Sequence, residues 1–593
     1  MFNSLKGGKV MFSSKSKTGL TVLLFLSLLI FFLNAYAEEV FHFAVVGDRT
    51  GGAQPGLYEK VLVEVNRLNP DIILTVGDFI EGYNQDSTLT NKQWDEYFGL
   101  LKDLKAKVYF TPGNHDIWDK TSEINYKNRV GNPYYSFNFK NSHFVILDVS
   151  RSEKFEEIPK EQINWLVSDL EKNRDKENIY VFFHKPFWFQ AIRDNKIDSL
   201  HQIFKKYGVD GVFSGHYHGY FAGEKEGIPY THMGSSGATI SFENRDLGYF
   251  PQFLWCSVNG NKLDVAVIEL GNILDRNLVT VKEETVIDKI VDGKCIEFFP
   301  ILIEESPKGF SFQGKVNITN AYEKTLRDTL RWECQDNWVI EPKSQSIEIE
   351  PSQTKTSSFK VDLKGGIYPL PKYSFNYPVG EKKVYPIDDR LWIKRELVCK
   401  TIKKSPKIDG KVLDAEWKEI TPVISLGSPT GDETVVEPTK FYFAYDKKNL
   451  YLAGRCTESK KDQMVAQAKA QDGAVYAEDC VGYFFCPDTV LKDIYQIYFN
   501  PLGTAFDQLI KYDGGNYNLD RNWNGKYEVK TFVGEGEWNI EIKIPFSQLK
   551  AKPKKGDSWE INFRRKQKRL NSASDWQYPI TYDIRYYGLM RFE

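Results

Sequence analysis

The chain lacks the paired thiols that zinc ribbons and redox dithiols need. Its seven cysteines are widely spaced, and no two of them form a Cys-x-x-Cys pair. The sequence therefore argues against both classes of site. The odd number leaves at least one thiol free unless the chain pairs with another. A disulfide between Cys456 and Cys480 is permitted by the sequence but is not required.

The chain also lacks a strong charge of either sign. Lys and Arg total 78 against 80 Asp and Glu, which gives a net charge of -2. After the first twenty residues no long run of like charge occurs. Nucleic acids and anionic membranes attract basic patches, so we expect neither as a partner.

Long apolar runs are missing except near the N-terminus. Residues 20–33 are apolar except for Thr21 and Ser27, follow several lysines and precede Ala35-Tyr36-Ala37. This order matches a secretory signal peptide, and the run is shorter than the ~20 residues that a membrane span needs. We expect residues 1–37 to be cleaved after Ala37, leaving a secreted or periplasmic protein with no stable membrane span. An uncleaved anchor is the alternative.

At 593 residues the chain is long enough for several domains. Residues 38–272 alternate short apolar runs with amphipathic stretches, which predicts an α/β layered domain. The expected strands are 40–46, 72–76, 108–110, 144–147, 180–183 and 209–213, and the expected helices are 57–68, 94–104, 163–170 and 200–207.

Behind this domain the helical signal fades. Short alternating strands separated by Pro, Gly, Asn and Lys predict an immunoglobulin-like β-sandwich over residues 285–397. A second all-β sandwich is expected over residues 400–593. The predicted architecture is therefore multidomain, with an α/β domain followed by two all-β sandwich domains.

Five short segments of the first domain place Asp, Asn or His directly after an apolar strand. They are Gly47-Asp48-Arg49-Thr50, Gly77-Asp78, Gly113-Asn114-His115-Asp116, Phe183-His184-Lys185-Pro186 and Gly215-His216-Tyr217-His218. Carboxylate, amide and imidazole donors from several strand ends are what a di- or trivalent metal ion requires. All eight histidines lie between His42 and His232, so imidazole is confined to the domain that would need it.

In this order the five segments resemble the signature of the calcineurin-like metallophosphoesterases, from Asp48 to His218. The resemblance implies a four-layer α/β/β/α sandwich that holds two metal ions. It implies that Asp78 bridges them. The remaining ligands implied are Asp48 and His218 for one metal, and Asn114, His184 and His216 for the other.

Two such ions would activate a water and neutralise charge on the phosphoryl oxygens of a phosphate-ester substrate. Donors of these types accept Mn, Fe or Zn. His115 stands beside Asn114 and is expected to protonate the leaving oxygen, with Asp116 orienting or charging its imidazole. Arg49 is a candidate phosphate clamp, with a strand-end salt bridge as the alternative.

One residue departs from the family pattern. The family has Asp-x-His in its first block, whereas here Thr50 replaces the metal-binding histidine. Three consequences are open: the first metal binds weakly, it uses water or Gln54 in place of the histidine, or it is absent. The histidines outside the motifs, His42, His143, His201 and His232, are expected to be hydrogen-bonded structural residues.

The last module opens with Pro406-Lys407-Ile408-Asp409-Gly410, followed by Leu413-Asp414-Ala415-Glu416-Trp417. These residues resemble the start of family 9-like carbohydrate-binding modules, and the resemblance covers nearly all of residues 400–593. It implies a possible glycan partner, bound by aromatic rings that stack on sugar faces. Trp523 and Trp576 lie in polar, loop-like surroundings and are the candidates. A structural sandwich without a ligand is the alternative.

The leading hypothesis is a phosphomonoester or phosphodiester hydrolase outside the cytoplasm, tethered to glycan by its rear module. The first alternative is a catalytically silent metallophosphoesterase domain that serves glycan attachment. A glycoside hydrolase is a weaker alternative, because no pair of carboxylates can be assigned to a separate cleft.

Overall fold

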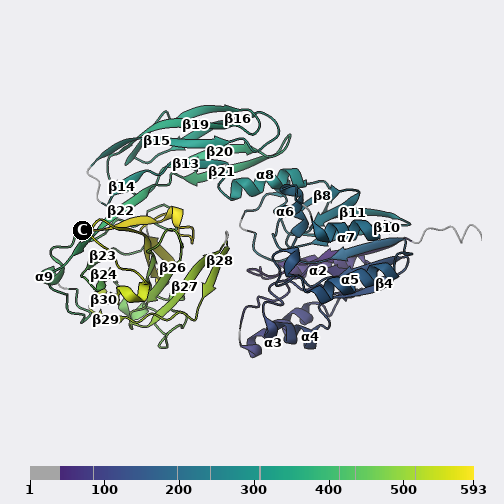
Figure 1. Ribbon diagram of the computed structural model, residues 1–593, viewed down its shortest axis with the longest axis horizontal. Helices are drawn as coiled ribbons and strands as arrows, with labels where there is room; N and C mark the ends of the chain where they lie inside the picture. The colour runs from purple at the N-terminus through teal and green to yellow at the C-terminus, as the bar shows by residue number, and fades with distance from the viewer. Residues whose placement is uncertain are drawn as a thin grey trace, which may run out of the picture. The chain divides into compact units, whose positions relative to one another are not determined.

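The structure is a computed structural model, and it describes residues 40–593 except 85, 197, 241, 306–308, 413, 434–435 and 514–515. The expected signal peptide lies outside the described residues. Contacts divide the chain into two units, Met1–Asp288 and Lys289–Glu593 (Figure 1). Among the described residues, no helix has both the length and the apolar character to cross a membrane.

Unit 1 contains two six-stranded sheets. The first has the order β12-β11-β10-β1-β2-β3 and the second β4-β5-β6-β7-β9-β8. The strands are β1 Phe41–Val46, β2 Ile72–Thr75, β3 Lys107–Tyr109, β4 Tyr135–Phe139, β5 Ser142–Ile146, β6 Asn178–Phe182, β7 Gly211–Ser214, β8 Phe221–Lys225, β9 Ile228–His232, β10 Gln252–Asn259, β11 Lys262–Glu269 and β12 Asn272–Asp275. In the first sheet β1, β2 and β3 are parallel, and in the second β5, β6 and β7 are parallel.

The main core of unit 1 lies between these two sheets. The ring of Phe43 on β1 packs edge-on against Phe144 and Phe213 of the second sheet, with centroids 5.6 and 5.9 Å apart. Almost every residue of β1 and β6 is buried. Parallel strands of layered folds are covered on both faces, which is why these two strands are mostly apolar in sequence.

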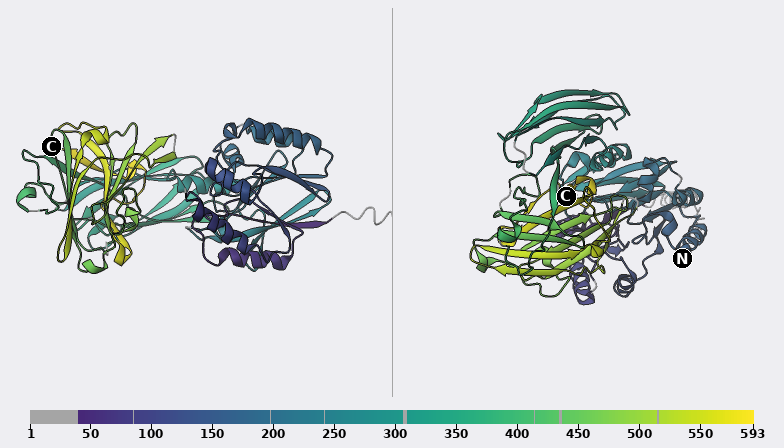
Figure 2. Two further views of the ribbon diagram at one scale, coloured as in Figure 1. Left: turned by 90° about the horizontal axis from the view of Figure 1, so that it is seen from below. Right: turned by 60° about the vertical axis from the view of Figure 1, so that its left-hand side comes forward.

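Helices cover the outer faces of both sheets, as Figure 2 shows for unit 1. Val61 and Val65 of α2 pack on the first sheet, four residues apart on one helical face. Leu166 of α5 and Phe204 of α7 belong to the core of the second sheet. The helices of unit 1 are α2 Leu57–Leu68, α3 Ser87–Leu100, α4 Lys120–Arg129, α5 Lys160–Lys172, α6 Phe187–Arg193, α7 Ser199–Tyr207 and α8 Val281–Val291, the last of which runs into unit 2.

The apolar periodicity located α2 at its observed bounds. The helix ends where Asn69 adopts a left-handed conformation with φ of 55°, and the Asn69 N–H donates to the carbonyl of Val65. No helix is predicted at α4, α6 or α8, and α3 begins at Ser87, before the predicted start at Trp94. The sequence of α4 is almost entirely polar, and α6 has only seven residues, so neither carries a clear apolar period.

Unit 2 begins with two four-stranded sheets, ordered β13-β15-β19-β17 and β18-β16-β20-β21. Trp332 on one sheet contacts Phe359 on the other, with ring centroids 4.9 Å apart. The strands are β13 Ile296–Phe298, β15 Phe310–Thr319, β16 Leu326–Glu333, β17 Trp338–Glu341, β18 Ser344–Ile349, β19 Thr354–Leu363, β20 Lys372–Pro378 and β21 Val384–Arg390.

The rest of unit 2 is one thirteen-stranded sheet that folds back on itself. Its main path is β28-β27-β26-β25-β31-β33-β22-β23-β24-β30-β29, with β14 beside β22 and β32 beside β31. Phe441 on β23 meets Phe563 on β31 across the core, with centroids 4.9 Å apart. The elements are β14 Leu302–Glu304, β22 Lys394–Thr401, α9 Asp414–Trp417, β23 Thr439–Tyr445, β24 Asn449–Thr457, β25 Cys480–Cys486, β26 Ile494–Phe499, β27 Ala505–Asp513, β28 Asn516–Asp520, β29 Glu528–Val533, β30 Glu537–Pro545, β31 Ser558–Gln567, β32 Ser572–Asp575 and β33 Gly588–Phe592.

The seven cysteines are all free in the structure. Cys456 and Cys480 are both buried, and no disulfide joins them. The four non-motif histidines are hydrogen-bonded, as expected. For example, His143 contacts Asn138 at 2.7 Å and Asp169 at 2.8 Å, and His201 contacts Tyr230 at 2.7 Å.

Candidate metal centre

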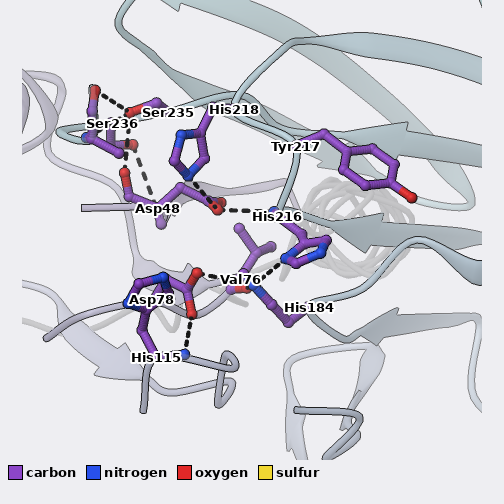
Figure 3. Close-up of polar contacts among 12 residues, drawn as sticks. Asp48, Val76, Asp78, His115, His184, His216, Tyr217, His218, Ser235 and Ser236 are labelled. Atoms are coloured by element: carbon purple, nitrogen blue, oxygen red, sulfur yellow. Dashed lines mark hydrogen bonds and ion pairs between the residues drawn. The ribbon is translucent and has the colours of Figure 1, made fainter. Parts of the chain in front are cut away.

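The loops that follow the strand ends bring the predicted ligands together. Asp48 follows β1, Asp78 follows β2, Asn114 follows β3 and His184 follows β6. The turn after β7 adds His216 and His218. Figure 3 shows most of this group converging from both sheets. The carboxyl ends of parallel strands therefore create the site, as they do in other layered α/β folds.

The backbone at the site is held in an uncommon conformation. Asp48, Asp78, His216 and His218 all have positive φ, between 46° and 94°. Residues other than glycine seldom adopt such angles, and those that do concentrate at functional sites. The turn after β3 also requires glycine at position 113, because a Cβ there would lie 2.0 Å from the Asp78 carboxylate.

Four donors form a compact group suited to one metal ion. Ligand atoms of Asp78, His184 and His216 all lie within 4.8 Å of one another. The His184 Nε2 atom is 3.1 Å from the Asp78 carboxylate and 3.0 Å from the Asn114 side-chain oxygen. His184 Nδ1 donates to the Val76 carbonyl at 2.6 Å, which leaves Nε2 for the metal.

Asp48 and His218 lie beside this group in a looser arrangement. The His218 Nε2 atom is 3.7 Å from Asp48 Oδ1, which also accepts the His216 backbone N–H at 2.8 Å. Asp48 Oδ2 is buried without a hydrogen-bond partner among the described residues. A buried carboxylate oxygen without a hydrogen-bond partner fits a cation, since a buried charge otherwise lacks compensation.

Thr50 and Gln54 are the residues that bear on the departure from the family pattern. Thr50 is buried, and its hydroxyl has no hydrogen-bond partner among the described residues. Burial would raise the pKa of Glu81, but hydrogen bonds from the N–H groups of Ala53 and Gly52 help to lower it overall. Gln54, the suggested substitute ligand, turns toward the Thr239 hydroxyl at 3.5 Å. Neither Thr50 nor Gln54 is turned toward Asp48 by any hydrogen bond among the described residues, so Asp48, Asp78 and His218 remain the candidate donors for the first metal position.

The pKa values of the donors are shifted by burial and by the charges of neighbouring donors. Burial disfavours the charged form of His184, but Asp78 and Asp48 outweigh it and raise the pKa of His184 to about 9. Burial and the neighbouring His184 lower the pKa of His216 to about 2, so this imidazole is neutral. Burial raises the pKa of Asp48 well above its usual range. A metal ion would displace the protons carried by these donors, because ligands bind metal in their deprotonated forms.

The His115 ring is oriented by a backbone group. Its Nδ1 lies 2.8 Å from the Glu81 carbonyl, an acceptor only, so Nδ1 carries the hydrogen. The Nε2 atom is then the one that exchanges a proton. The expectation that Asp116 orients this imidazole is corrected by the structure.

Asp116 instead joins two ligand-bearing loops. Its buried carboxylate accepts the backbone N–H groups of Asp78, Phe79 and Gly113, each at 2.8 Å. Burial and the proximity of Asp78 raise its pKa to about 7. Asp116 therefore positions Asp78, through backbone hydrogen bonds, and makes no contact with the His115 ring.

Arg49 forms a salt bridge, which was the alternative to a phosphate clamp. Its guanidinium donates to the Phe79 carbonyl at 2.9 Å and forms a salt bridge with Glu96. The side chain is 11% exposed, and both contacts hold it among structural partners. The structure therefore does not support Arg49 as a phosphate clamp.

Two residues near the ligands were missed by sequence reasoning. The hydroxyl of Tyr83 accepts a hydrogen bond from the Asn114 amide at 3.1 Å, and its ring packs edge-on against His115. Lys185 follows His184 directly and pairs with Glu153. The sequence could have indicated Lys185, because this residue lies inside a segment that carries a metal ligand. It gave no such indication for Tyr83, which lies in a polar loop after the Asp78 motif.

Trp576 was expected to offer an exposed ring to a sugar, and this placement is wrong. It is fully buried, stacks on Phe563 at 5.0 Å, and donates its indole N–H to Glu305 at 2.7 Å. Arg395 covers it at 5.3 Å and pairs with Glu305. Polar neighbours in sequence suggested a surface loop, but here they form a buried hydrogen-bond network.

Trp523 is only partly buried, as a binding ring would be. It packs edge-on against Tyr495 with centroids 5.1 Å apart. The neighbouring Asn524 accepts a hydrogen bond from Gln471 at 2.7 Å. Asn524 and Gln471 are both exposed.

Comparison with known proteins places the site in a family domain. Residues 41–220 match the family model described as calcineurin-like phosphoesterase. Human acid phosphatase type 7 is 27% identical over 231 residues, which are 32% of this chain and 51% of that protein. Purple acid phosphatase 15 of Arabidopsis thaliana is 28% identical over 221 residues, or 30% of this chain and 40% of that protein. The chain thus spans about half the length of such relatives or less.

A solved structure also matches about a third of the chain, at low similarity. It is a carbohydrate binding module family 9 from Caldicellulosiruptor kristjanssonii in complex with cellotriose. It is 15% identical with a TM-score of 0.26, covering 33% of this chain and 93% of that one. The family match thus covers residues 41–220 of the N-terminal part, and the later part of the described chain is rich in β-strands.

Proposed function

We propose that this protein is a metal-dependent phosphoester hydrolase whose centre is held by the loops after β1, β2, β3, β6 and β7. One observation carries the proposal: the donors of Asp78, His184 and His216 lie within 4.8 Å of one another inside a phosphoesterase family domain. Asn114 completes that position, and Asp48 with His218 offers a second one that shares Asp78.

The residues divide the chemistry between them. Metal ions held by these donors would supply Lewis acidity toward the phosphoryl group and an activated water nucleophile. His115, protonated at Nε2, would donate its proton to the leaving oxygen while the Glu81 carbonyl holds Nδ1–H. Asp116 holds the turns at Asp78 and Gly113 in a fixed position relative to each other, so that the donors are preorganised.

Hydrolysis of chromogenic phosphates tests the proposal. The purified protein is assayed on p-nitrophenyl phosphate and bis(p-nitrophenyl) phosphate with added Mn, Fe or Zn, and bound metal is counted by mass spectrometry. We expect turnover that a chelator abolishes and added metal restores. A protein that binds metal and turns over neither ester would favour the silent, glycan-attaching alternative.

We further propose that the protein acts outside the cytoplasm and is targeted to glycan. The order of Lys residues, apolar run and Ala35-Tyr36-Ala37 supports export. The sandwich of residues 285–397 would then serve as an immunoglobulin-like spacer. Trp523, with the exposed amides of Asn524 and Gln471 beside it, is the residue we propose to contact a sugar.

Replacing Trp523 with alanine is expected to weaken glycan binding about tenfold or more, because stacking and area burial by one aromatic ring both disappear. Affinity electrophoresis in gels that contain soluble polysaccharides measures the change, with Trp523→Phe retaining part of the retardation. Trp165→Ala, at a partly buried tryptophan of α5, is the matched control. Unchanged retardation of Trp523→Ala would exclude this ring as the sugar platform.

A further inference from the structure

Tyr83 is an exposed aromatic side chain at the candidate metal centre. It is 55% exposed, the highest value of any Phe, Tyr or Trp among the described residues. Its ring packs edge-on against His115 with centroids 5.0 Å apart, and it lies 5.6 Å from the ring of Trp118. Its hydroxyl accepts a hydrogen bond from the Asn114 amide at 3.1 Å. An aromatic ring exposed beside a proposed acid and a metal donor indicates a surface that contacts a ligand.

The residues before Tyr83 hold its ring in a fixed position. The Tyr83 backbone has a φ of 48°, which bulky residues rarely adopt and which is found mainly at functional sites. The Glu81 carbonyl accepts the His115 Nδ1–H at 2.8 Å, and a Cβ on Gly82 would collide with the His115 carbonyl oxygen. Residues 81–83 therefore pack closely on His115 while the Tyr83 ring faces solvent. A ring held in this way binds a ligand with little loss of conformational freedom.

The free nitrogen of His115 borders the same space as a metal donor. Nδ1–H is held by Glu81, so Nε2 is the atom that delivers a proton. A Cβ built on Gly51 would lie 3.9 Å from His115 Nε2 and 3.3 Å from His218 Nε2. Gly51 has no side chain to occupy this space. The alcohol part of an ester that is protonated there lies next to His115, whose ring is in contact with Tyr83.

We propose that Tyr83 determines the substrate by contacting a flat aromatic ring in the alcohol part of the phosphate ester. This inference rests on the proposed function and names the class of alcohol, an aryl or a nucleoside group. Aromatic rings attract one another in offset-stacked or edge-on arrangements. The Tyr83 hydroxyl is engaged by Asn114, which leaves the exposed ring to meet the substrate. A saturated alcohol of equal size would bury apolar area without the ring-to-ring attraction.

Binding of two phosphonates that cannot be hydrolysed tests the inference on metal-loaded protein. Benzylphosphonate and cyclohexylmethylphosphonate carry the same charge and are similar in size, but only the first has a flat ring. By calorimetry, the wild-type protein should bind benzylphosphonate at least about fivefold more tightly, and Tyr83→Leu should reduce this preference to less than about twofold. Tyr83→Phe should keep the preference, because the ring remains. Metal content and the affinity for inorganic phosphate, measured in parallel, report any disturbance of Asn114 by loss of the hydroxyl.

Tyr476→Ala is the matched control, since this tyrosine of unit 2 is 43% exposed and packs edge-on against Phe506. It should keep the wild-type preference. Equal affinity of the two phosphonates in the wild-type protein, or a preference that survives in Tyr83→Leu, would overturn the inference. A preference that depends on Tyr83 in a protein that hydrolyses no ester would instead refute the proposed function and leave the ring contact standing.

Hydrolysis distinguishes the two sources of a flat ring. The ratio kcat/KM is measured for phenyl phosphate, adenosine monophosphate and glucose phosphate in the wild-type protein and in Tyr83→Leu. We expect the loss to be larger for one or both of the first two esters than for glucose phosphate. A loss confined to phenyl phosphate would identify an aryl ester, and one confined to adenosine monophosphate would identify a nucleoside. A loss that is largest for glucose phosphate would overturn the inference.

Discussion

Replacing Asp78 with alanine is expected to empty the metal centre and to lower kcat/KM by more than about a thousandfold. The Asp78 carboxylate lies 3.1 Å from His184 Nε2 and also accepts the backbone N–H of His115 at 2.9 Å. It is the donor common to both proposed metal positions. Its loss removes metal-ion catalysis, which is worth several kcal/mol, and each 1.36 kcal/mol is tenfold in rate.

Two measurements separate this effect from misfolding. Metal content per chain should fall toward zero in Asp78→Ala, while circular dichroism should retain the wild-type secondary structure. Asp264→Ala is the matched control, because Asp264 is a 60% exposed aspartate on β11 of the same unit. If Asp78→Ala kept two metal ions per chain, the assignment of Asp78 as the shared donor would be wrong.

Replacing His115 with alanine is expected to lower kcat by about a hundredfold to ten-thousandfold, the usual contribution of general acid catalysis. The reason is local: Nδ1–H is held by the Glu81 carbonyl at 2.8 Å, so Nε2 is the atom that can deliver a proton. The loss should be larger for phenyl phosphate than for p-nitrophenyl phosphate, because a more basic leaving oxygen depends more on protonation.

The metal content of His115→Ala should equal that of the wild-type protein, since the ring is not one of the donors grouped at the centre. His42→Ala is the comparison, because this histidine of β1 contacts Ser257 at 3.0 Å and stacks on Trp255 away from the donors. Equal losses for both leaving groups would argue against a role in leaving-group protonation. Wild-type turnover would reject His115 as the acid.

The predictions made from the sequence fail most often at polar residues whose partners the sequence does not reveal. The adjacency of Asp116 to His115 suggested a catalytic pair, but the turn directs the carboxylate toward the N–H groups of residues 78 and 79. Trp576 was placed on the surface because its neighbours are polar. Those neighbours prove to be buried: Asp575 pairs with Arg564 on the adjacent strand, and the side chain of Gln577 accepts the backbone N–H of Arg395, far away in the sequence.

By itself, the sequence predicted six strands of unit 1, namely β1, β2, β3, β5, β6 and β7, together with the helix α2 and a set of candidate metal donors that the structure brings together. These features depend on local signals, namely apolar runs of strand length, a helical period, and polar residues placed just after strands. Only the tertiary structure decided the partners of Arg49, Asp116, Lys185 and Trp576. The direction of a polar side chain depends on which donors and acceptors the packed sheets bring within about 3 Å, and this is a property of the whole fold.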